Sequence, residues 1–438
     1  MMTYLPQLVF IALLGGMSYL IAQRFSLILQ TIRLARPVAL TDHPAERFKR
    51  MALLAFGQKK MFSKPLVGFF HFLIYIGFVL INIEILEIVL DGVLGTHRLF
   101  APFLGSFYRL LLNFFELLAS GVFVACFVFF LRRGVFRIAR LQASNHKELC
   151  GFPVQDAYQI LLIELVLMLA LWTMNGADAV LQTRGLEHYH PVGSFVISGE
   201  LFGIFAQLST SALLVLERAA WWFHILGILS FALYVTYSKH LHIFFAFPAA
   251  YFSSLESSAK MSAMPAVTHE VKLMLGQAVE EQPETNAKFG AKDVMDLTWK
   301  NALDAYSCTE CGRCTEQCPA NQTGRALSPR KIMMDTRDRL EEVGRVLKVN
   351  KGNLVEDGKS LFDRISAEEL RACTSCQACV EACPMELSPL NIILEMRRYL
   401  IMEQSDAPAA WNSMFANVET NQSPWKFNPA DRLNWAKE

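Results

Sequence analysis

Eight of the ten cysteines lie in two groups of four within residues 308–383. In each group three cysteines are separated by two residues each, and a fourth follows after three more residues and precedes a proline. Three closely spaced cysteines bind three corners of a [4Fe–4S] cube, and the cysteine before proline binds the other cube of a two-cluster ferredoxin. The spacing therefore predicts two clusters with crossed ligands: one held by Cys308, Cys311, Cys314 and Cys383, the other by Cys373, Cys376, Cys379 and Cys318.

Zinc sites and disulfides are the alternatives for so many cysteines. Zinc sites use pairs of ligands rather than runs of four that end in Cys-Pro, and a reducing compartment favours metal ligands over disulfides. The whole unit also repeats, because Leu-Ser-Pro and an amphipathic stretch (residues 330–343 and 390–403) follow each group. Both alternatives are therefore disfavoured.

Histidines inside apolar stretches are the second set of candidate ligands. His224 and His242 stand eighteen residues apart in one apolar run, and His71 lies in another. In a continuous helix this spacing puts both rings on one face about 27 Å apart, whereas His240 points about 160° away from His224. The pattern suits axial ligands to two stacked b-type haems, each completed by a histidine of a second helix. The alternative is a buried, hydrogen-bonded histidine or one at the membrane interface.

The composition indicates a membrane protein. Of the 438 residues 53% are hydrophobic and only 18% are charged, against about 25% charged in a typical soluble domain. The net charge of +1 offers no basic surface for nucleic acid. Five runs are long enough to span a bilayer, near residues 5–28, 66–90, 110–131, 157–181 and 220–248. We expect an all-α bundle of five transmembrane helices followed by a mainly α-helical dicluster ferredoxin domain.

The loops between the expected spans differ in positive charge. Six Lys and Arg residues in the first loop (positions 47–64) and five in the third (132–147) contrast with two in each of the other connections. By the positive-inside rule the N-terminus is outside, and the cysteine-rich half lies in the cytoplasm at the inner membrane. The first run is expected to be an anchor rather than a cleaved signal peptide, because no basic residue precedes it. Residues 182–219 are expected to lie along the outer surface.

The membrane half resembles a known family through its five spans and the ending Ser238-Lys239-His240-Leu241-His242. It is similar to the cytochrome b subunit of respiratory nitrate reductases and to the membrane subunit of heterodisulfide reductases. The resemblance implies an inner haem b bound by His71 and His242. It places Ile81, which cannot ligate, at the outer position of the second span. His224 is then left with His97, His188 or His190, with a five-coordinate haem, or with none.

The eight-cysteine unit resembles the iron–sulfur subunit of heterodisulfide reductases and related oxidoreductases, including those that accept electrons from electron-transfer flavoprotein. The resemblances imply a subunit of a quinone-linked oxidoreductase that passes electrons from a cytoplasmic donor through both clusters and haem b to the quinone pool. Substrate chemistry is expected on a partner, because no Gly-x-Gly-x-x-Gly follows a strand pattern. The alternatives are flow from quinol to a cytoplasmic disulfide-type acceptor, and a haem-free membrane-tethered iron–sulfur redox sensor.

These patterns divide the chain into four parts: a five-span cytochrome b-like domain (1–252), a linker (253–288), a two-[4Fe–4S] ferredoxin domain (289–404) and a C-terminal tail (405–438). The tail carries Trp411, Trp425 and Trp435, and such aromatic residues are typical of interfaces. The alternative is that the tail folds onto its own ferredoxin domain. In the resembling fused proteins a similar stretch leads into Cys-Cys-Gly repeats, whereas Cys-Cys is absent here. We expect a separate Cys-Cys-Gly iron–sulfur subunit to bind the tail, and an electron-transfer flavoprotein or another cytoplasmic flavoprotein as a further partner.

Overall fold

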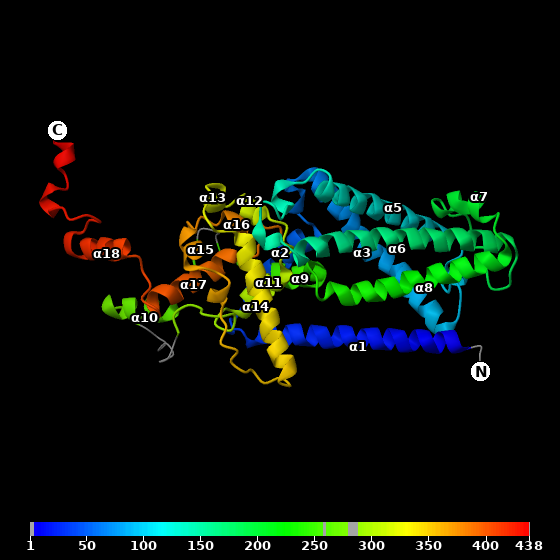
Figure 1. Ribbon diagram of the computed structural model, residues 1–438, viewed down its shortest axis with the longest axis horizontal. Helices are drawn as coiled ribbons and strands as arrows, with labels where there is room; N and C mark the ends of the chain where they lie inside the picture. Colours follow the sequence, from blue (N-terminus) through cyan, green and yellow to red (C-terminus); the bar gives the residue numbers. More distant parts are fainter. Residues whose placement is uncertain (1–3, 257–259, 279–287, 438) are drawn as a thin grey trace.

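The computed structural model describes residues 4–256, 260–278 and 288–437, and it is elongated, with a helical bundle at one end and the cysteine-rich half at the other (Figure 1). None of these described residues forms a β-strand. Five helices are long and apolar enough to cross a membrane: α1 (Leu5–Leu34), α3 (Pro65–Leu94), α5 (Ser106–Gly134), α6 (Phe152–Thr183) and α8 (Thr210–Val235). The expected all-α architecture with five spans is confirmed.

Local sequence explains where these helices begin. A proline occupies the first turn of α1, α3 and α6, where the missing N–H is not needed and the fixed φ angle suits the helix. The Ser209 side chain instead caps α8 by accepting a hydrogen bond from the Ala212 amide. With 26 to 32 residues each, the helices exceed the ~20 residues that a bilayer requires.

Four of the spans pack into a bundle, and α1 lies along one side of it (Figure 1). Helix α6 packs against α5 and α8, α3 packs against α5, and α1 contacts α3 and α8. Their shared core includes Phe10, Ile81, Val122, Leu171 and Ile225. The bundle therefore has one end that contacts the cysteine-rich half, called here the cluster-facing end, and an opposite far end.

The last span differs from the prediction. The apolar run predicts one helix near residues 220–248, but α8 runs from Thr210 to Val235, and α9 (His242–Tyr251) starts separately. Ser238 is extended and its side chain accepts a hydrogen bond from the His240 amide, which starts a 3₁₀ turn. Because the helix is interrupted, the argument that His224 and His242 share a helical face is wrong. The expectation that His240 points elsewhere is also wrong, since its ring lies 5.3 Å from that of His242.

Short elements connect the spans. Near the cluster-facing end are α2 (Pro44–Met51) and a π-helical segment, Ala52–Phe56, and between other spans lie α4 (Ala101–Leu104) and α7 (Phe202–Phe205). Residues 182–209 contain only turns and the short α7 before α8 begins. No sixth span crosses in this described region, as the sequence predicts.

The cysteine-rich half is a compact helical domain around a core that includes Leu303, Ile332, Leu361, Ile393 and Met396. The repeated Leu-Ser-Pro is a repeated helix start: Ser328 accepts from the Lys331 amide and Ser388 from the Asn391 amide. The two expected amphipathic helices are α14 and α17. The helices of this half are α11 (Trp299–Ser307), α12 (Arg313–Glu316), α13 (Pro319–Gln322), α14 (Pro329–Val349), α15 (Ala367–Ala372), α16 (Ala378–Ala382) and α17 (Pro389–Met402).

Two segments extend away from this domain (Figure 1). Helix α10 (Pro265–Met274) lies within the predicted linker, whose positions 257–259 and 279–287 fall outside the described residues. Helix α18 (Ala409–Asn421) belongs to the C-terminal tail, in which Trp425 and Trp435 are 67% and 78% exposed. The tail therefore does not pack its tryptophans against the ferredoxin core.

The cysteine-rich half is attached to α1 by specific contacts. Arg24 donates to Glu341 of α14 at 2.7 Å, and the Arg36 amide donates to the Leu297 carbonyl at 2.8 Å. A Cβ at Gly344 would lie 3.2 Å from the Thr31 hydroxyl, so glycine permits this close approach of α14 to α1. The two halves are thus held in a defined orientation.

Candidate redox centres at the cluster-facing end

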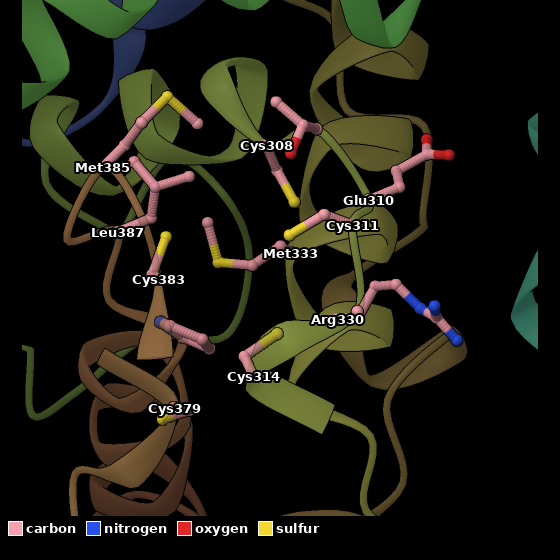
Figure 2. A pocket seen from close by; sticks show the side chains of 13 residues that line it. Cys308, Glu310, Cys311, Cys314, Arg330, Met333, Cys379, Cys383, Met385 and Leu387 are labelled. Carbon is pink, nitrogen blue, oxygen red and sulfur yellow. The ribbon is translucent and has the colours of Figure 1, made fainter. Parts of the chain in front are cut away.

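The first cysteine group surrounds a cavity of about 370 Å³. Cys308, Cys311 and Cys314 reach it from one side, and Cys383 of the second group reaches it from the other (Figure 2). Cys379 also lines the cavity but lies further off, on α16. The structure therefore brings together the four residues predicted to hold one cluster.

The second group is arranged in the same way around Cys318. Burial first, and then the charges of Cys373 and Cys376, raise the pKa of the Cys318 thiol. The pKa of Cys379 rises to about 12 through burial and then the charges of Cys373 and Cys318. These interactions require the sulfur atoms to lie close together, so the second predicted set of four is also assembled.

The two loops share a backbone path. Glu310 and Ser375 stand two residues after the first cysteine of each group, and both have φ of +56°. Gly312 and Gln377, two residues further on, have φ of +73° and +63°. Left-handed residues at these matched positions turn the chain so that successive sulfurs face one side. The sequence repeat is therefore a structural repeat.

The donor set fits an iron–sulfur cluster. Buried thiols resist deprotonation: burial and then Cys311 raise the pKa of Cys383 to about 12. A bound cluster supplies the positive charge that stabilises such thiolates. Backbone amides assist, because the Ser375 amide donates to the Cys373 sulfur at 3.4 Å, and the Glu310 amide bonds to the Cys308 sulfur. Amide bonds to sulfur tune the reduction potential of such clusters.

Two of the predicted haem ligands lie at the same end. His71 and His242 are within electrostatic range of one another. The His71 Nδ1 lies 2.9 Å from the Gln58 side-chain oxygen, and the His242 Nδ1 lies 3.1 Å from the Lys239 carbonyl. Because these oxygens only accept, each Nδ1 carries the proton and each Nε2 is left as a free donor to a metal. This arrangement fits axial ligation by both rings.

His224 has one half of such a site. Its Nδ1 lies 3.0 Å from the Leu167 carbonyl, and its side chain is buried. Of the candidate partners, His97 and His188 pack against each other at the far end with ring centroids 5.4 Å apart, and His190 is exposed. The residues around His224 therefore supply one imidazole and do not fit a bis-histidine haem.

Several residues that link the two halves are missed by reasoning from sequence. Lys239 donates to Glu310 at 2.7 Å, and Arg337 donates to the same carboxylate at 2.7 Å. Burial opposes ionisation of Glu310, but Arg337 and then Lys239 hold its pKa below the ordinary value. Each partner is ordinary in sequence, and only the location of Glu310 between two cysteines could have drawn attention to it.

A second polar group, at the far end, was also not foreseen as a unit. Arg98 donates to Asp178 and to Asn175, and Asn175 donates to Glu116 at 3.2 Å. Glu87 accepts from Tyr108 at 2.7 Å. Polar residues at positions 175 and 178 of an otherwise apolar run were the available signal.

Comparison with known proteins identifies the type of the cysteine-rich domain. The profile of the 4Fe-4S dicluster domain matches residues 307–387, so this region is an iron–sulfur domain for two clusters. No solved structure is significantly similar to the chain.

Two curated relatives cover nearly the whole chain. The probable iron–sulfur-binding oxidoreductase FadF of Bacillus subtilis is 26% identical over 98% of it, and the EtfAB:quinone oxidoreductase of Syntrophomonas wolfei is 28% identical over 91%. The chain spans 61% and 55% of the length of these relatives.

A third relative resembles only the cysteine-rich half. It belongs to the ferredoxin/F420H2-dependent CoB-CoM heterodisulfide reductase of Methanosarcina acetivorans, and it is 30% identical over 26% of the chain and 56% of its own length. The predicted resemblance to heterodisulfide reductase-like iron–sulfur oxidoreductases is confirmed.

Proposed function

We propose that this chain is the membrane electron-transfer subunit of a quinone-linked oxidoreductase. Electrons from a cytoplasmic donor would pass through two [4Fe–4S] clusters and one haem b to the quinone pool. The observation that carries the proposal is the meeting of both cysteine sets with His71 and His242 at one end of the bundle. The relation to a quinone oxidoreductase supports the acceptor.

In this proposal the chain's own residues hold and orient the redox groups. One cluster is bound by Cys308, Cys311, Cys314 and Cys383, and the other by Cys373, Cys376, Cys379 and Cys318. His71 and His242 bind haem b through Nε2, and the group supplies one-electron chemistry when bound. His224 offers a single imidazole, so any haem at its depth would be five-coordinate.

The proposed orientation places the cysteine-rich half in the cytoplasm and the N-terminus outside. The two loops rich in Lys and Arg both lie at the cluster-facing end, where Lys64 and Arg140 pair with Glu316 of the ferredoxin domain. Agreement between the charge rule and this arrangement supports the orientation.

We further propose that the tail, residues 405–438, binds a Cys-Cys-Gly iron–sulfur partner, with a flavoprotein as the electron source. Its exposed tryptophans support a binding role, since buried aromatic anchors carry most of the energy of many interfaces. Deleting residues 405–438 should leave haem and cluster spectra intact but release the partner and stop quinone reduction. Full activity and co-purification after the deletion would contradict this part of the proposal.

The central experiment is a reduced-minus-oxidised absorption spectrum of the purified protein, together with paramagnetic resonance of the reduced clusters. We expect the α-band of a low-spin b haem and signals from two interacting [4Fe–4S] clusters. Clusters without a haem band would show that the bundle is not the electron route and would favour the redox-sensor alternative.

A further inference from the structure

Glu310 connects the first cysteine group to the membrane half. It stands between Cys308 and Cys311, and its backbone amide bonds to the Cys308 sulfur. Its carboxylate is buried, with one oxygen bound to Arg337 of α14 and the other to Lys239. One residue thus touches a cluster ligand through its backbone and the membrane half through its side chain.

Lys239 continues this connection toward His242. Its ammonium group donates to Glu310 and, at 2.6 Å, to the Pro153 carbonyl, and it lies 3.6 Å from Asp156. Its backbone carbonyl accepts the hydrogen bond from His242 Nδ1. The path from the Cys308 sulfur to the His242 ring therefore runs through hydrogen bonds and two residues, without a gap.

We propose that the Lys239–Glu310 pair is a positioning link that fixes the loop of the first cysteine group relative to the loop that orients His242. The inference deepens the proposed function, because the groups whose separation it fixes are the first cluster and the inner haem. Lys239 and Arg337 balance Glu310 and Asp156, so the buried site is neutral. Paired charges in such a site are held in one geometry more strictly than apolar contacts would be.

The link has a defined role in electron transfer. One electron leaves a reduced cluster, which becomes oxidised by one unit, and converts one ferric haem iron to ferrous; no bond or proton changes at the pair. Lys239 and Glu310 keep the distance and relative orientation constant during this step. Small displacements of reacting groups change rates by about one to two orders of magnitude.

A second ion pair crosses the same interface and serves as a control. Arg330 donates to Glu148 at 2.9 Å, its side chain is fully buried, and it lines the same cysteine cavity. Its other interface contact is the Arg140 carbonyl. This pair thus joins the two halves beside the cavity but makes no hydrogen bond to a histidine.

The first test uses hydrogen–deuterium exchange on the detergent-solubilised protein with its cofactors. In Glu310→Gln and Lys239→Met, exchange in residues 309–313 and in residues 236–242 should rise together, by about tenfold. Glu148→Gln should raise exchange only around residues 146–149 and 328–331. Lys239→Arg, which keeps the charge, should restore most of the protection.

The second test measures the rate of haem reduction after rapid photochemical reduction of the clusters. Glu310→Gln and Lys239→Met should slow this rate by about tenfold while leaving the equilibrium haem spectrum unchanged. The double variant should be no slower than either single variant, because both remove the same link.

Two results would overturn the inference. One is an exchange increase in Glu310→Gln that stays within residues 309–313 and leaves residues 236–242 unchanged. The other is an equal slowing of haem reduction in Glu148→Gln. If the wild-type protein contains no haem, the proposed function fails, whereas the exchange experiment still decides whether the two loops are linked.

Discussion

The two ends of the membrane bundle hold polar residues of different kinds. At the cluster-facing end, His71 and His242 use one ring nitrogen for orientation and leave the other free. At the far end, Arg98, Asp178 and neighbouring polar side chains bond mainly to one another. Free donor atoms indicate ligand binding, and mutually satisfied groups indicate structural closure. The comparison assigns redox chemistry to one end and stability to the other.

The largest expected effect concerns the crossed cysteines. Cys383→Ser should eliminate the cluster that shares its cavity with Cys308, and Cys318→Ser should eliminate the other. Paramagnetic resonance of each variant reports which cluster is lost. Loss of the same cluster in Cys318→Ser and Cys308→Ser would show that each group binds its own cube.

The next effect concerns the haem. His242→Ala and His71→Ala should each abolish the low-spin b-haem band, because each removes an axial nitrogen. His240→Ala should keep the band, although its ring packs against that of His242. The absorption spectrum of the three purified variants is the measurement. A spectrum lost in His240→Ala and retained in His242→Ala would reverse the assignment of the ligand.

At the far end we expect a loss of stability without a change in spectrum. Asp178→Ala leaves the buried Arg98 without its main carboxylate and should lower the free energy of unfolding by about 3 kcal/mol. Denaturant titration in detergent micelles, followed by tryptophan fluorescence, measures this change. Asp178→Asn, which keeps the size of the side chain and its carbonyl acceptor, is the milder control. Altered haem or cluster signals in Asp178→Ala would break the division between the two ends.

The smallest effect concerns orientation of the haem ligand. Gln58→Leu removes the acceptor for His71 Nδ1. That hydrogen bond makes the ring more basic and so favours ferric iron; its loss should raise the haem reduction potential by about 30 mV, roughly a threefold change in the redox equilibrium. Spectroelectrochemical titration measures the shift. A potential unchanged within error would mean that Gln58 does not tune the haem.

Much of this arrangement could be predicted because it depends on local spacing. The cysteine intervals, the repeated Leu-Ser-Pro and the length of the apolar runs each carry their own structural meaning, and the helices follow them. The break after Val235 could not be read in the same way. It depends on Asp156 of α6, which accepts from the Tyr234 hydroxyl and the Lys239 amide, and such tertiary partners leave no periodic signal.

The same limit applies to the pairs between the two halves. Lys239 and Glu310 are 71 residues apart, and Arg330 and Glu148 are 182 apart. Each looks like an ordinary charged residue until the fold brings it to its partner. Spacing predicted the ligands, and only the fold revealed what orients them.

The contact between α1 and α14 has a consequence for biogenesis. Arg24 lies in the first helix to be synthesised, and its partner Glu341 follows 317 residues later. At about 5 to 20 residues per second, translation alone separates the two by roughly 15 to 60 s. During that interval the bundle can assemble around α1 while the side that receives α14 stays uncovered. Attachment of the iron–sulfur domain is therefore a late step, and a chain that stalls before residue 341 leaves the Arg24 guanidinium without its carboxylate.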